Sequence, residues 1–386
     1  MSDNIKKQLI SIRREIHKHP ELSGKEFKTT AFIEKQLNKA GIKTLRITKT
    51  GVLGIIKGTK ASKESKKCIA LRADIDALPV CEKTGMVYAS KNSGIMHACG
   101  HDGNSTIVLG AALLLKKQSN DFSGTVKLVF QPSEEDGNGA NSLIKKGVLL
   151  NPKVDTIVGV HVNPWLSCGS IGFKYGEMMA AVDKFKIEII GNSGHGAYPH
   201  LGVDAVVIAS QVINSIQNIV SREIDPTEPA VITIGKIEGG TRYNVLCGNV
   251  TMEGTVRTLD EKLHKKMAGM IERKIKNIVK AYGADYRFKY EIVGYPLKNT
   301  GKILDFCKRT AVKLYGASKI KMLTKPSMGG EDFSEYLRFV PGCFIYMGSS
   351  KKKSYSWHHE KFDIDENVLP IGANLLAGIA KKYLNN

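Results

Sequence analysis

Six of the ten histidines stand where an α/β protein could use them for chemistry. Each is predicted at the end of a strand or in a glycine-rich loop, the places where open α/β folds build their sites. They are His97, His101, His161, His195, His358 and His359. Structural or surface roles are expected for the other four, which are His17 and His19 at a helix end, His200 in a turn and His264 on an exposed helix face.

The segment from His97 to Asp102 can aim a thiolate and an imidazole at one point. Cys99 and His101 are two residues apart around a glycine, so a turn or an extended loop can bring their side chains together. Thiolate and imidazole are suitable ligands for zinc and its neighbours. The alternative is a buried cysteine beside an aspartate that caps a helix, and the segment alone does not decide between the two.

Two adjacent glutamates, Glu134 and Glu135, follow a strand of apolar residues and precede a glycine-rich loop. Adjacent carboxylates repel, and holding both near an apolar strand end costs free energy unless something compensates. A metal ion would compensate, because one carboxylate can bind it while the other acts as a general base on water. The alternative for such a pair is a solvated acidic loop.

Further polar residues follow other predicted strands. Asp74 and Asp76 face the same side of an extended chain, and carboxylates placed in this way can hold an imidazole ligand in one tautomer. His161 directly follows another strand, and His358 and His359 lie near the C-terminus. So many polar clusters at strand ends of one domain favour a functional site over unrelated surface groups.

Apolar periodicity predicts strands and helices that alternate along the first part of the chain, which indicates an α/β layer fold with a largely buried sheet. From residue 184 to 292 the predicted order is β-α-β-β-α-β, the ferredoxin-like split unit. Alternating helices and strands then return. We therefore expect a discontinuous main domain at 1–180 and 295–386, interrupted by a smaller inserted domain at 181–294.

The composition is typical of a folded chain with two domains. The 386 residues are too many for one ordinary core, and 42% hydrophobic with 24% charged residues is typical of globular proteins. No apolar run approaches the ~20 residues that span a bilayer, and the polar start has no signal-peptide core. The seven cysteines show no compact repeated spacing, so reduced thiols are expected. We therefore expect a cytoplasmic protein with no membrane partner.

The formal net charge of +20 raises the question of nucleic-acid binding. The lysines are scattered along the whole chain, and aromatic residues make up only 7%. A nucleic-acid surface more often combines clustered arginines with interleaved aromatic residues. We interpret the charge as a lysine-coated surface whose field helps to draw in carboxylate substrates, and we expect no nucleic-acid partner.

Five motifs make the sequence resemble the metallopeptidase-related amidohydrolases. This family includes aminoacylases, hippurate hydrolases, indole-acetyl-amino-acid hydrolases, N-acetyldiaminopimelate deacetylases and some carboxypeptidases. The motifs are Leu71–Pro79, Met96–Asp102, Gln131–Glu135, Gly194–His200 and Gly330–Phe333. The likeness runs from Ile12 to the C-terminal helix. It implies a zinc-exopeptidase-like catalytic α/β domain with an inserted ferredoxin-like domain that serves as a lid and in dimerisation.

The resemblance also implies two divalent metal ions and assigns their ligands. The implied ligands are Cys99, His101, Glu135, His161 and His358. Glu134 would be the general base and later the proton donor to the leaving amine, and Asp76 would orient the metal site. Residue chemistry does not separate His358 from His359, but the family's spacing to an aromatic residue, here Phe362, favours His358. A thiolate favours zinc, and manganese, cobalt or nickel are the alternatives.

Three residues of the inserted domain match positions near the substrate in relatives. His195 would be a lid histidine that reaches an active site, often that of the partner subunit. Asn244 and Arg257 would lie near the substrate. A donor on a lid is sensible chemistry, because the tetrahedral intermediate needs its oxyanion stabilised and closure of the lid excludes water.

The sequence departs from the family pattern at four positions. Asn104 stands where relatives usually have a second histidine, and Ser133 stands where alanine is common. Cys247 replaces a usual proline, and Gly329 occupies a position that is larger or different in many relatives. Asn104 and Gly329 are expected near the pocket, so the substrate stays open, although no departure removes an implied ligand.

The expected activity is hydrolysis of the amide bond of an N-acyl amino acid or short peptide with a free carboxylate, by a homodimer or a higher homo-oligomer. A narrower alternative within the family is an N-acetyldiaminopimelate deacetylase of lysine biosynthesis. An alternative of another class is a non-catalytic metal-binding or peptide-binding protein on the same scaffold. The presence of both Glu134 and Glu135 argues against that class.

Overall fold

The computed structural model describes residues 3–61 and 67–386. The chain divides into two compact units. Unit 1 consists of Met1–Gly176, Lys298–Lys325 and Asp332–Asn386, and unit 2 consists of Glu177–Leu297 and Pro326–Glu331. None of the helices in the two described ranges combines the length and the apolar character that a membrane span requires.

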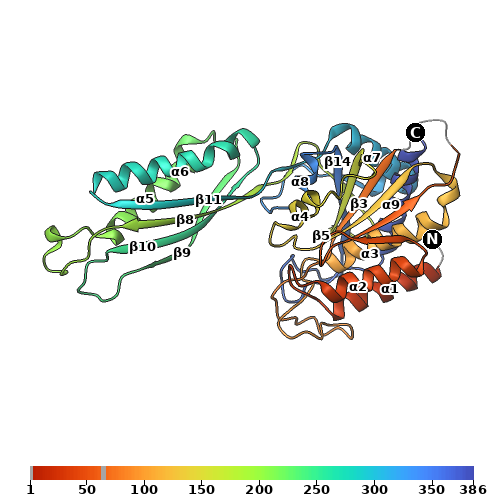
Figure 1. Ribbon diagram of the computed structural model, residues 1–386, viewed down its shortest axis with the longest axis horizontal. Coiled ribbons are helices and arrows are strands. Elements are labelled where there is room, and N and C mark those ends of the chain that lie inside the picture. Colours follow the sequence, from red (N-terminus) through yellow and green to blue (C-terminus); the bar gives the residue numbers. More distant parts are fainter. Residues whose placement is uncertain (1–2, 62–66) are drawn as a thin grey trace. The chain divides into compact units, whose positions relative to one another are not determined.

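Unit 1 is built around an eight-stranded sheet with the order β1-β2-β4-β3-β5-β14-β6-β13 (Figure 1). Strand β3 runs parallel to β4 and β5, and β14 runs parallel to β5, whereas β1 and β2 add an antiparallel edge. The strands are β1 (Lys43–Arg46), β2 (Val52–Lys57), β3 (Cys68–Asp74), β4 (Thr125–Gln131), β5 (Thr156–Ser167), β6 (Ile171–Phe173), β13 (Ile320–Met322) and β14 (Gly342–Ser350).

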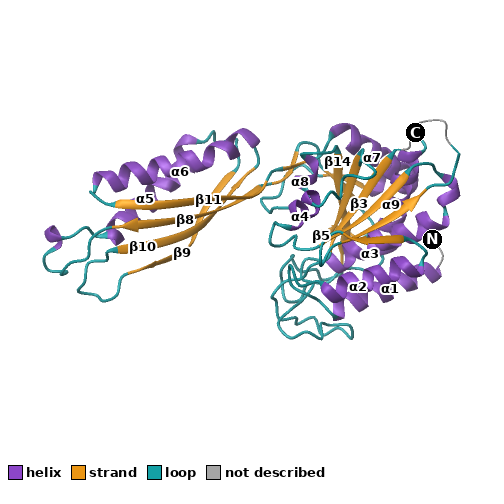
Figure 2. Cartoon of the chain, in the orientation of Figure 1, coloured by secondary structure: helices purple, strands orange, loops and turns teal. Residues whose placement is uncertain are grey.

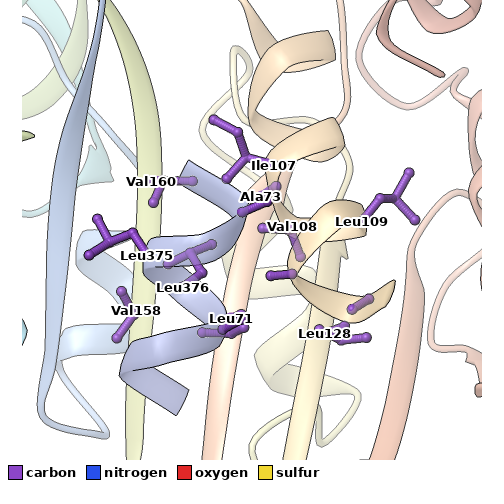
Figure 3. Close-up of a cluster of buried hydrophobic side chains, with 14 of the residues drawn as sticks. Leu71, Ala73, Ile107, Val108, Leu109, Leu128, Val158, Val160, Leu375 and Leu376 are labelled. Atoms are coloured by element: carbon purple, nitrogen blue, oxygen red, sulfur yellow. The ribbon is translucent and has the colours of Figure 1, made fainter. Parts of the chain in front are cut away.

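Helices cover this sheet and close the core of unit 1. They are α1 (Asp3–Lys18), α2 (Phe27–Lys39), α3 (His101–Lys117), α4 (Gly139–Lys145), α7 (Gly301–Tyr315), α8 (Ser334–Leu337) and α9 (Val368–Leu384), with short 3-10 turns at Ser119–Asp121 and Ala317–Lys319. Helices α3 and α9 pack against each other. Figure 3 shows Val108 of α3 and Leu376 of α9 among side chains of the central strands, including Leu71 and Val158.

The central strands are apolar because layers of helices bury them. Every residue of β3 and β4 is buried, which is the pattern of a parallel strand covered on both faces. The predicted α/β class is therefore confirmed for unit 1. The arrangement also aligns the strand ends, since parallel strands finish at the same edge of the sheet and α3 begins at that edge.

Unit 2 is an antiparallel sheet with the order β11-β8-β10-β9 and two helices, which is the predicted ferredoxin-like arrangement. Burial alternates along β8, so one face of the sheet is covered, and Figure 2 shows both helices on one side. The elements are β8 (Ala181–Ile190), α5 (Ala205–Asn218), β9 (Ala230–Gly239), β10 (Asn249–Thr258), α6 (Glu261–Ala281) and β11 (Asp285–Gly294), with a 3-10 turn at Pro199–Leu201 and a π-turn at Ile219–Glu223. A separate small sheet joins β7 (Glu177–Met179) and β12 (Leu297–Lys298).

Helix α6 corrects one expectation. His264 was expected on an exposed helix face, but it is only 3% exposed, and its Nε2 lies 2.9 Å from Oδ1 of the fully buried Asp183 on β8. Tyr290 of β11 donates its hydroxyl to the other oxygen of Asp183 at 2.6 Å. His264 is therefore part of a buried polar cluster in unit 2 and is not an inert surface residue.

Candidate metal centre

The site of unit 1 forms where β3 and β4 end beside His161, which lies within β5 and not after it as predicted. Asp74 is the last residue of β3 and pairs in register with Gln131, the last residue of β4. On the other side of β3, Arg72 pairs with Gly159 of β5, which puts His161 level with Asp74. Helix α3 begins at His101 beside these strand ends. The backbone therefore delivers carboxylates and imidazoles from three strands and one helix to one place.

A left-handed glycine lets the chain present Cys99 and His101 together. Gly100 has φ 91°, and a Cβ at this position would lie 2.4 Å from Cγ2 of Val162. Only glycine combines this conformation with such a close approach. Cys99 then lies before the turn and His101 begins the helix, as the spacing of the two residues predicts.

Six side chains meet in overlapping groups. Within unit 1, potential ligand atoms that lie within 4.8 Å of one another form three sets, which are Cys99 with His101 and His161, Cys99 with Glu135 and His358, and His101 with Glu134 and Glu135. The Cys99 sulfur lies 3.5 Å from Nε2 of His161, and Glu135 Oε1 lies 3.6 Å from Nε2 of His358. Because Cys99 and Glu135 join the sets, the cluster offers room for more than one cation.

The two central histidines are held in the tautomer that a metal requires. His101 Nδ1 lies 3.0 Å from the carbonyl oxygen of Asp76 and 3.1 Å from its carboxylate. His161 donates from Nδ1 to the carbonyl oxygen of Val162 at 2.8 Å. Each ring therefore presents the lone pair of Nε2 to the cluster, the arrangement that is usual in metal-binding histidines. Asp76 is itself fixed, since it accepts from Ser23 Oγ at 2.8 Å and from the Glu135 amide at 3.0 Å.

Two buried atoms of the cluster indicate that a cation belongs there. In the described part of the chain, His101 Nε2 and Glu135 Oε1 are buried and have no hydrogen-bond partner. Leaving such groups unpaired costs about 1–3 kcal/mol each. Burial raises the pKa of Glu135 to about 7 and raises the pKa of the Cys99 thiol, whereas burial lowers the pKa of His161 to about 4. A bound divalent cation would offset the free-energy cost of burying the Glu135 carboxylate and the Cys99 thiolate. The residues therefore fit a metal.

The geometry distinguishes His358 from its neighbour His359. His358 has φ 65°, its amide donates to the carbonyl of Ala98 at 2.8 Å, and its ring belongs to the cluster. His359 instead stacks on Tyr355, with ring centroids 4.6 Å apart. Among the described residues, His359 occurs in none of the potential ligand sets. The structure therefore brings His358 to the other candidate ligands, and His359 is directed elsewhere.

A buried ion network supports the cluster from within the sheet. Arg72 is fully buried and donates to Asp74 at 2.8 Å, to Asp332 at 2.7 Å and to Gln131 at 2.9 Å. Burial disfavours the Asp74 carboxylate, but the charges of His101 and Arg72 outweigh burial and lower its pKa. Sequence reasoning did not single out Arg72 or Asp332, although both lie inside the motifs that carry the resemblance.

Asn104, which was expected near the pocket, is fully buried in the first turn of α3. Its amide nitrogen donates to Asp74 at 2.8 Å, and its carbonyl oxygen accepts from the Val162 amide at 2.9 Å. Asn104 therefore ties β5, next to His161, to the ion network.

Sequence reasoning also missed Glu26, which holds the loop before the two site glutamates. Glu26 is fully buried, and its Oε1 accepts from the amides of Gly24 at 2.9 Å and Ser133 at 2.8 Å. Ser133 has φ 54°, a conformation that a residue other than glycine rarely adopts, so it needs this support. Burial raises the pKa of Glu26 to about 7, and the charge of Asp76 adds to the rise.

His17 lies in the last turn of α1, where it was predicted, and is packed behind the start of α3. Its Nδ1 lies 2.7 Å from Asp102 Oδ2, and Arg13 donates to the same oxygen at 2.6 Å. All three side chains are fully buried. Asp102 follows His101 directly, so this ion cluster fixes the first turn of α3 against α1.

The three expected substrate residues belong to unit 2. The loop of His195 pairs with that of Asn244, because the amide of Gly196 donates to the Asn244 carbonyl at 2.8 Å. The side chains of His195 and Asn244 are exposed. Arg257 lies on β10, is half-buried and donates to Thr255 Oγ1 and, at 3.2 Å, to the carbonyl of Val256. The structure thus brings His195 close to Asn244, whereas Arg257 extends from the sheet.

The chain matches known proteins over nearly its whole length. Residues 70–382 match the family model described as peptidase family M20/M25/M40. An N-acetyl-L-cysteine deacetylase of Bacillus subtilis is 42% identical over 385 residues, which cover 99% of this chain and 89% of the relative.

Two solved structures are also similar. One is a putative aminohydrolase from methicillin-resistant Staphylococcus aureus, with a TM-score of 0.93 and 33% identity over 99% of this chain and 97% of the other. A dinuclear metal-binding peptidase of the M20 family from Bacillus subtilis has a TM-score of 0.85 and 35% identity, with 99% of both chains covered.

Proposed function

Because the chain belongs to peptidase family M20/M25/M40 and is a hydrolase, we propose that it cleaves the amide bond of an N-acyl amino acid or a short peptide with a free carboxylate. The observation that carries the proposal is the adjacent pair of Glu134 and Glu135 beside Cys99, His101, His161 and His358. The name of the Bacillus subtilis deacetylase supports an N-acyl amino acid as the class of substrate.

We assign Cys99, His101, Glu135, His161 and His358 as ligands of two divalent ions, with zinc favoured by the thiolate. Two ions would fit a cluster whose ligand sets overlap at Cys99 and Glu135. When bound, such ions polarise the substrate carbonyl and lower the pKa of water. The buried, unpartnered Nε2 of His101 and Oε1 of Glu135 support this assignment.

Glu134 is assigned as the general base. Its Oε2 lies 3.9 Å from Nε2 of His101, so the carboxylate borders the ligand cluster. Glu134 takes a proton from the attacking water and later passes it to the nitrogen of the leaving amine, which makes the amine a better leaving group. Asp76 orients His101 through its carbonyl and carboxylate oxygens.

Three residues of unit 2 are assigned to the substrate. His195 is proposed to stabilise the oxyanion, and Asn244 and Arg257 are proposed to bind the polar groups of the substrate, with unit 2 serving as a lid and as the dimerisation surface. An imidazole, an amide and a guanidinium supply the hydrogen-bond donors that an oxyanion and a carboxylate need. The assembly would be a homodimer or a higher homo-oligomer.

The test combines a hydrolysis panel with metal analysis. The panel holds acetyl-amino and benzoyl-amino acids, N-acetyldiaminopimelate and dipeptides, each with and without a chelator. We expect chelator-sensitive hydrolysis of at least one substrate, and we expect Glu134→Gln to lose at least about a thousandfold in kcat while it keeps its metal, as the loss of a general base and its positioned water predicts. A metal-loaded, active Glu134→Gln variant would refute the mechanism.

A further inference from the structure

The only two tryptophans of the chain lie side by side at the edge of the candidate metal centre. Trp165 belongs to the last part of β5, and Trp357 immediately precedes His358. Their ring centroids are 4.4 Å apart with an interplanar angle of 77°, an edge-to-face contact. The fold therefore gathers indole rings from two distant parts of the sequence at one place in unit 1.

Trp357 connects this pair to the candidate ligands. Its ring centroid is 5.2 Å from that of His161, again edge-to-face, and its indole N–H donates to the Val162 carbonyl at 3.1 Å. Tyr346 of β14 lies beneath it, with ring centroids 5.9 Å apart. Trp357 is thus fixed in orientation, and its hydrogen-bond donor is already used within the protein.

Trp165 is the solvent-exposed member of the pair. It is 63% exposed, and its backbone amide donates to Oδ1 of Asn163 at 2.9 Å, which orients the end of β5. In the part of the chain that the structure describes, Trp357 is the one aromatic ring that contacts Trp165. An exposed tryptophan held beside catalytic groups typically marks a binding surface, because a ligand that covers it removes a large apolar area from water.

The position of Trp165 and Trp357 indicates which group of the substrate they would contact. The faces of the indole rings carry no positive charge to pair with a carboxylate, and the N–H of Trp357 is already engaged. An apolar group suits the indole faces better. The acyl substituent is bonded directly to the carbonyl that reacts beside His161 and His358, whereas an amino-acid side chain is attached beyond the amide nitrogen. The substituent nearest to the cluster is therefore the acyl group.

We infer that Trp165 and Trp357 form a subsite for an aromatic or bulky apolar acyl group, so that the preferred substrates are N-aroyl or similar N-acyl amino acids and not acetyl derivatives. The inference rests on the proposed function, because it needs an amide substrate at the candidate metal centre. It assigns a specificity role to two residues that the catalytic assignment does not use.

The first test measures a specificity ratio. The ratio compares kcat/KM for N-benzoylalanine with kcat/KM for N-acetylalanine in the metal-loaded enzyme. We expect Trp165→Ala to lower this ratio about tenfold, which corresponds to about 1.4 kcal/mol, and Trp165→Phe to restore most of it. Phe339→Ala is a matched control, because Phe339 is 60% exposed and lies just beyond α8 in the same unit.

The ratio of N-acetylphenylalanine to N-acetylalanine separates the two sides of the amide. If Trp165→Ala lowers this ratio and spares the benzoyl-to-acetyl ratio, the rings bind the amino-acid side chain, and the acyl assignment is wrong. A benzoyl-to-acetyl ratio that is unchanged in Trp165→Ala, or one that falls equally in Phe339→Ala, also overturns the inference.

A binding measurement keeps the inference testable if no substrate is turned over. Since the chain has only these two tryptophans, its tryptophan emission reports on the subsite. In the Glu134→Gln variant, N-benzoylalanine should change this emission in a saturable way, and N-acetylalanine should change it much less. An equal or absent response to both compounds refutes the subsite, whereas a selective response without any amide hydrolysis refutes only the proposed function.

Discussion

The two units bury polar groups in very different amounts. In unit 1, Arg13, Arg72, Asp74 and Asp102 are all completely buried, and every one of them takes part in an ion pair. In unit 2, a buried contact joins His264 to Asp183, and the core cluster of this unit is made of apolar side chains. The residues of unit 2 that matter most for the proposed chemistry, His195 and Asn244, are exposed.

This difference separates residues that are positioned by folding from residues that are free to adapt. A buried charge network costs desolvation free energy, but it holds each member in one geometry before a substrate arrives. Exposed side chains cost little to change and carry no fixed orientation of their own. Substitutions in the network of unit 1 should therefore alter folding, whereas substitutions at the exposed residues of unit 2 should alter turnover alone.

The largest effect on stability is expected for Arg72→Met. Removing the guanidinium takes away the cation that pairs with the buried carboxylates of Asp74 and Asp332, a change that typically costs about 3–5 kcal/mol. Urea unfolding, followed by circular dichroism, measures the difference in the free energy of unfolding from the wild type.

Arg14→Met is the matched control for this experiment. Arg14 also pairs with a carboxylate, at 2.6 Å from Glu366, but its side chain is 40% exposed. Exposed pairs contribute about 0–1 kcal/mol. Equal losses of stability in the two variants would show that burial does not determine how much an ion pair contributes in this protein.

A smaller effect, which depends on pH, is expected for Glu26→Gln. The folded pKa of Glu26, about 7, lies above the ordinary value of 4.5. The stability that the protonated carboxyl contributes is therefore present below pH 4.5 and is lost as the pH rises through 7. At about 1.4 kcal/mol per pKa unit, the loss is about 3 kcal/mol.

Glutamine at position 26 keeps an acceptor for the amides of Gly24 and Ser133 but does not titrate. The free energy of unfolding of wild type relative to Glu26→Gln should therefore fall between pH 4.5 and pH 8. Urea unfolding of both proteins across this range measures the difference. If the free energies of unfolding of the two proteins change with pH in the same way, Glu26 is not the buried group that titrates.

Much of this architecture could be predicted because it depends on local patterns. Alternating apolar residues predicted the β-α-β-β-α-β order of unit 2, which the structure confirms. Buried parallel strands such as β3 and β4 end at one edge, so polar residues after each strand were expected to meet. The structure brings Cys99, His101, Glu135, His161 and His358 together in overlapping sets, and their role as ligands stays a proposal.

The supporting residues could not be predicted, because their partners are distant in the sequence. Arg72 and Asp332 are 260 positions apart, and His264 and Asp183 are 81 positions apart. His264 was expected on an exposed helix face, but the tertiary packing of α6 places that histidine beside Asp183. The contacts of the Asn104 side chain could not be predicted for a similar reason, since only the packing of α3 against β3 and β5 decides which way it points.

The smallest effect on stability is expected for His195→Ala. This variant tests most directly whether the exposed residues of unit 2 act in turnover and not in folding. The His195 side chain is exposed and accepts one hydrogen bond, from the Ala197 amide at 3.0 Å. Its removal should change the free energy of unfolding by less than about 0.5 kcal/mol. If His195 stabilises the oxyanion, kcat should nevertheless fall about a hundredfold to a thousandfold. Urea unfolding and steady-state kinetics on one preparation measure both quantities. A large loss of stability with unchanged kcat would reverse the division of roles between the two units, because His195 would then be a folding residue in the unit whose exposed side chains are proposed to act on the substrate.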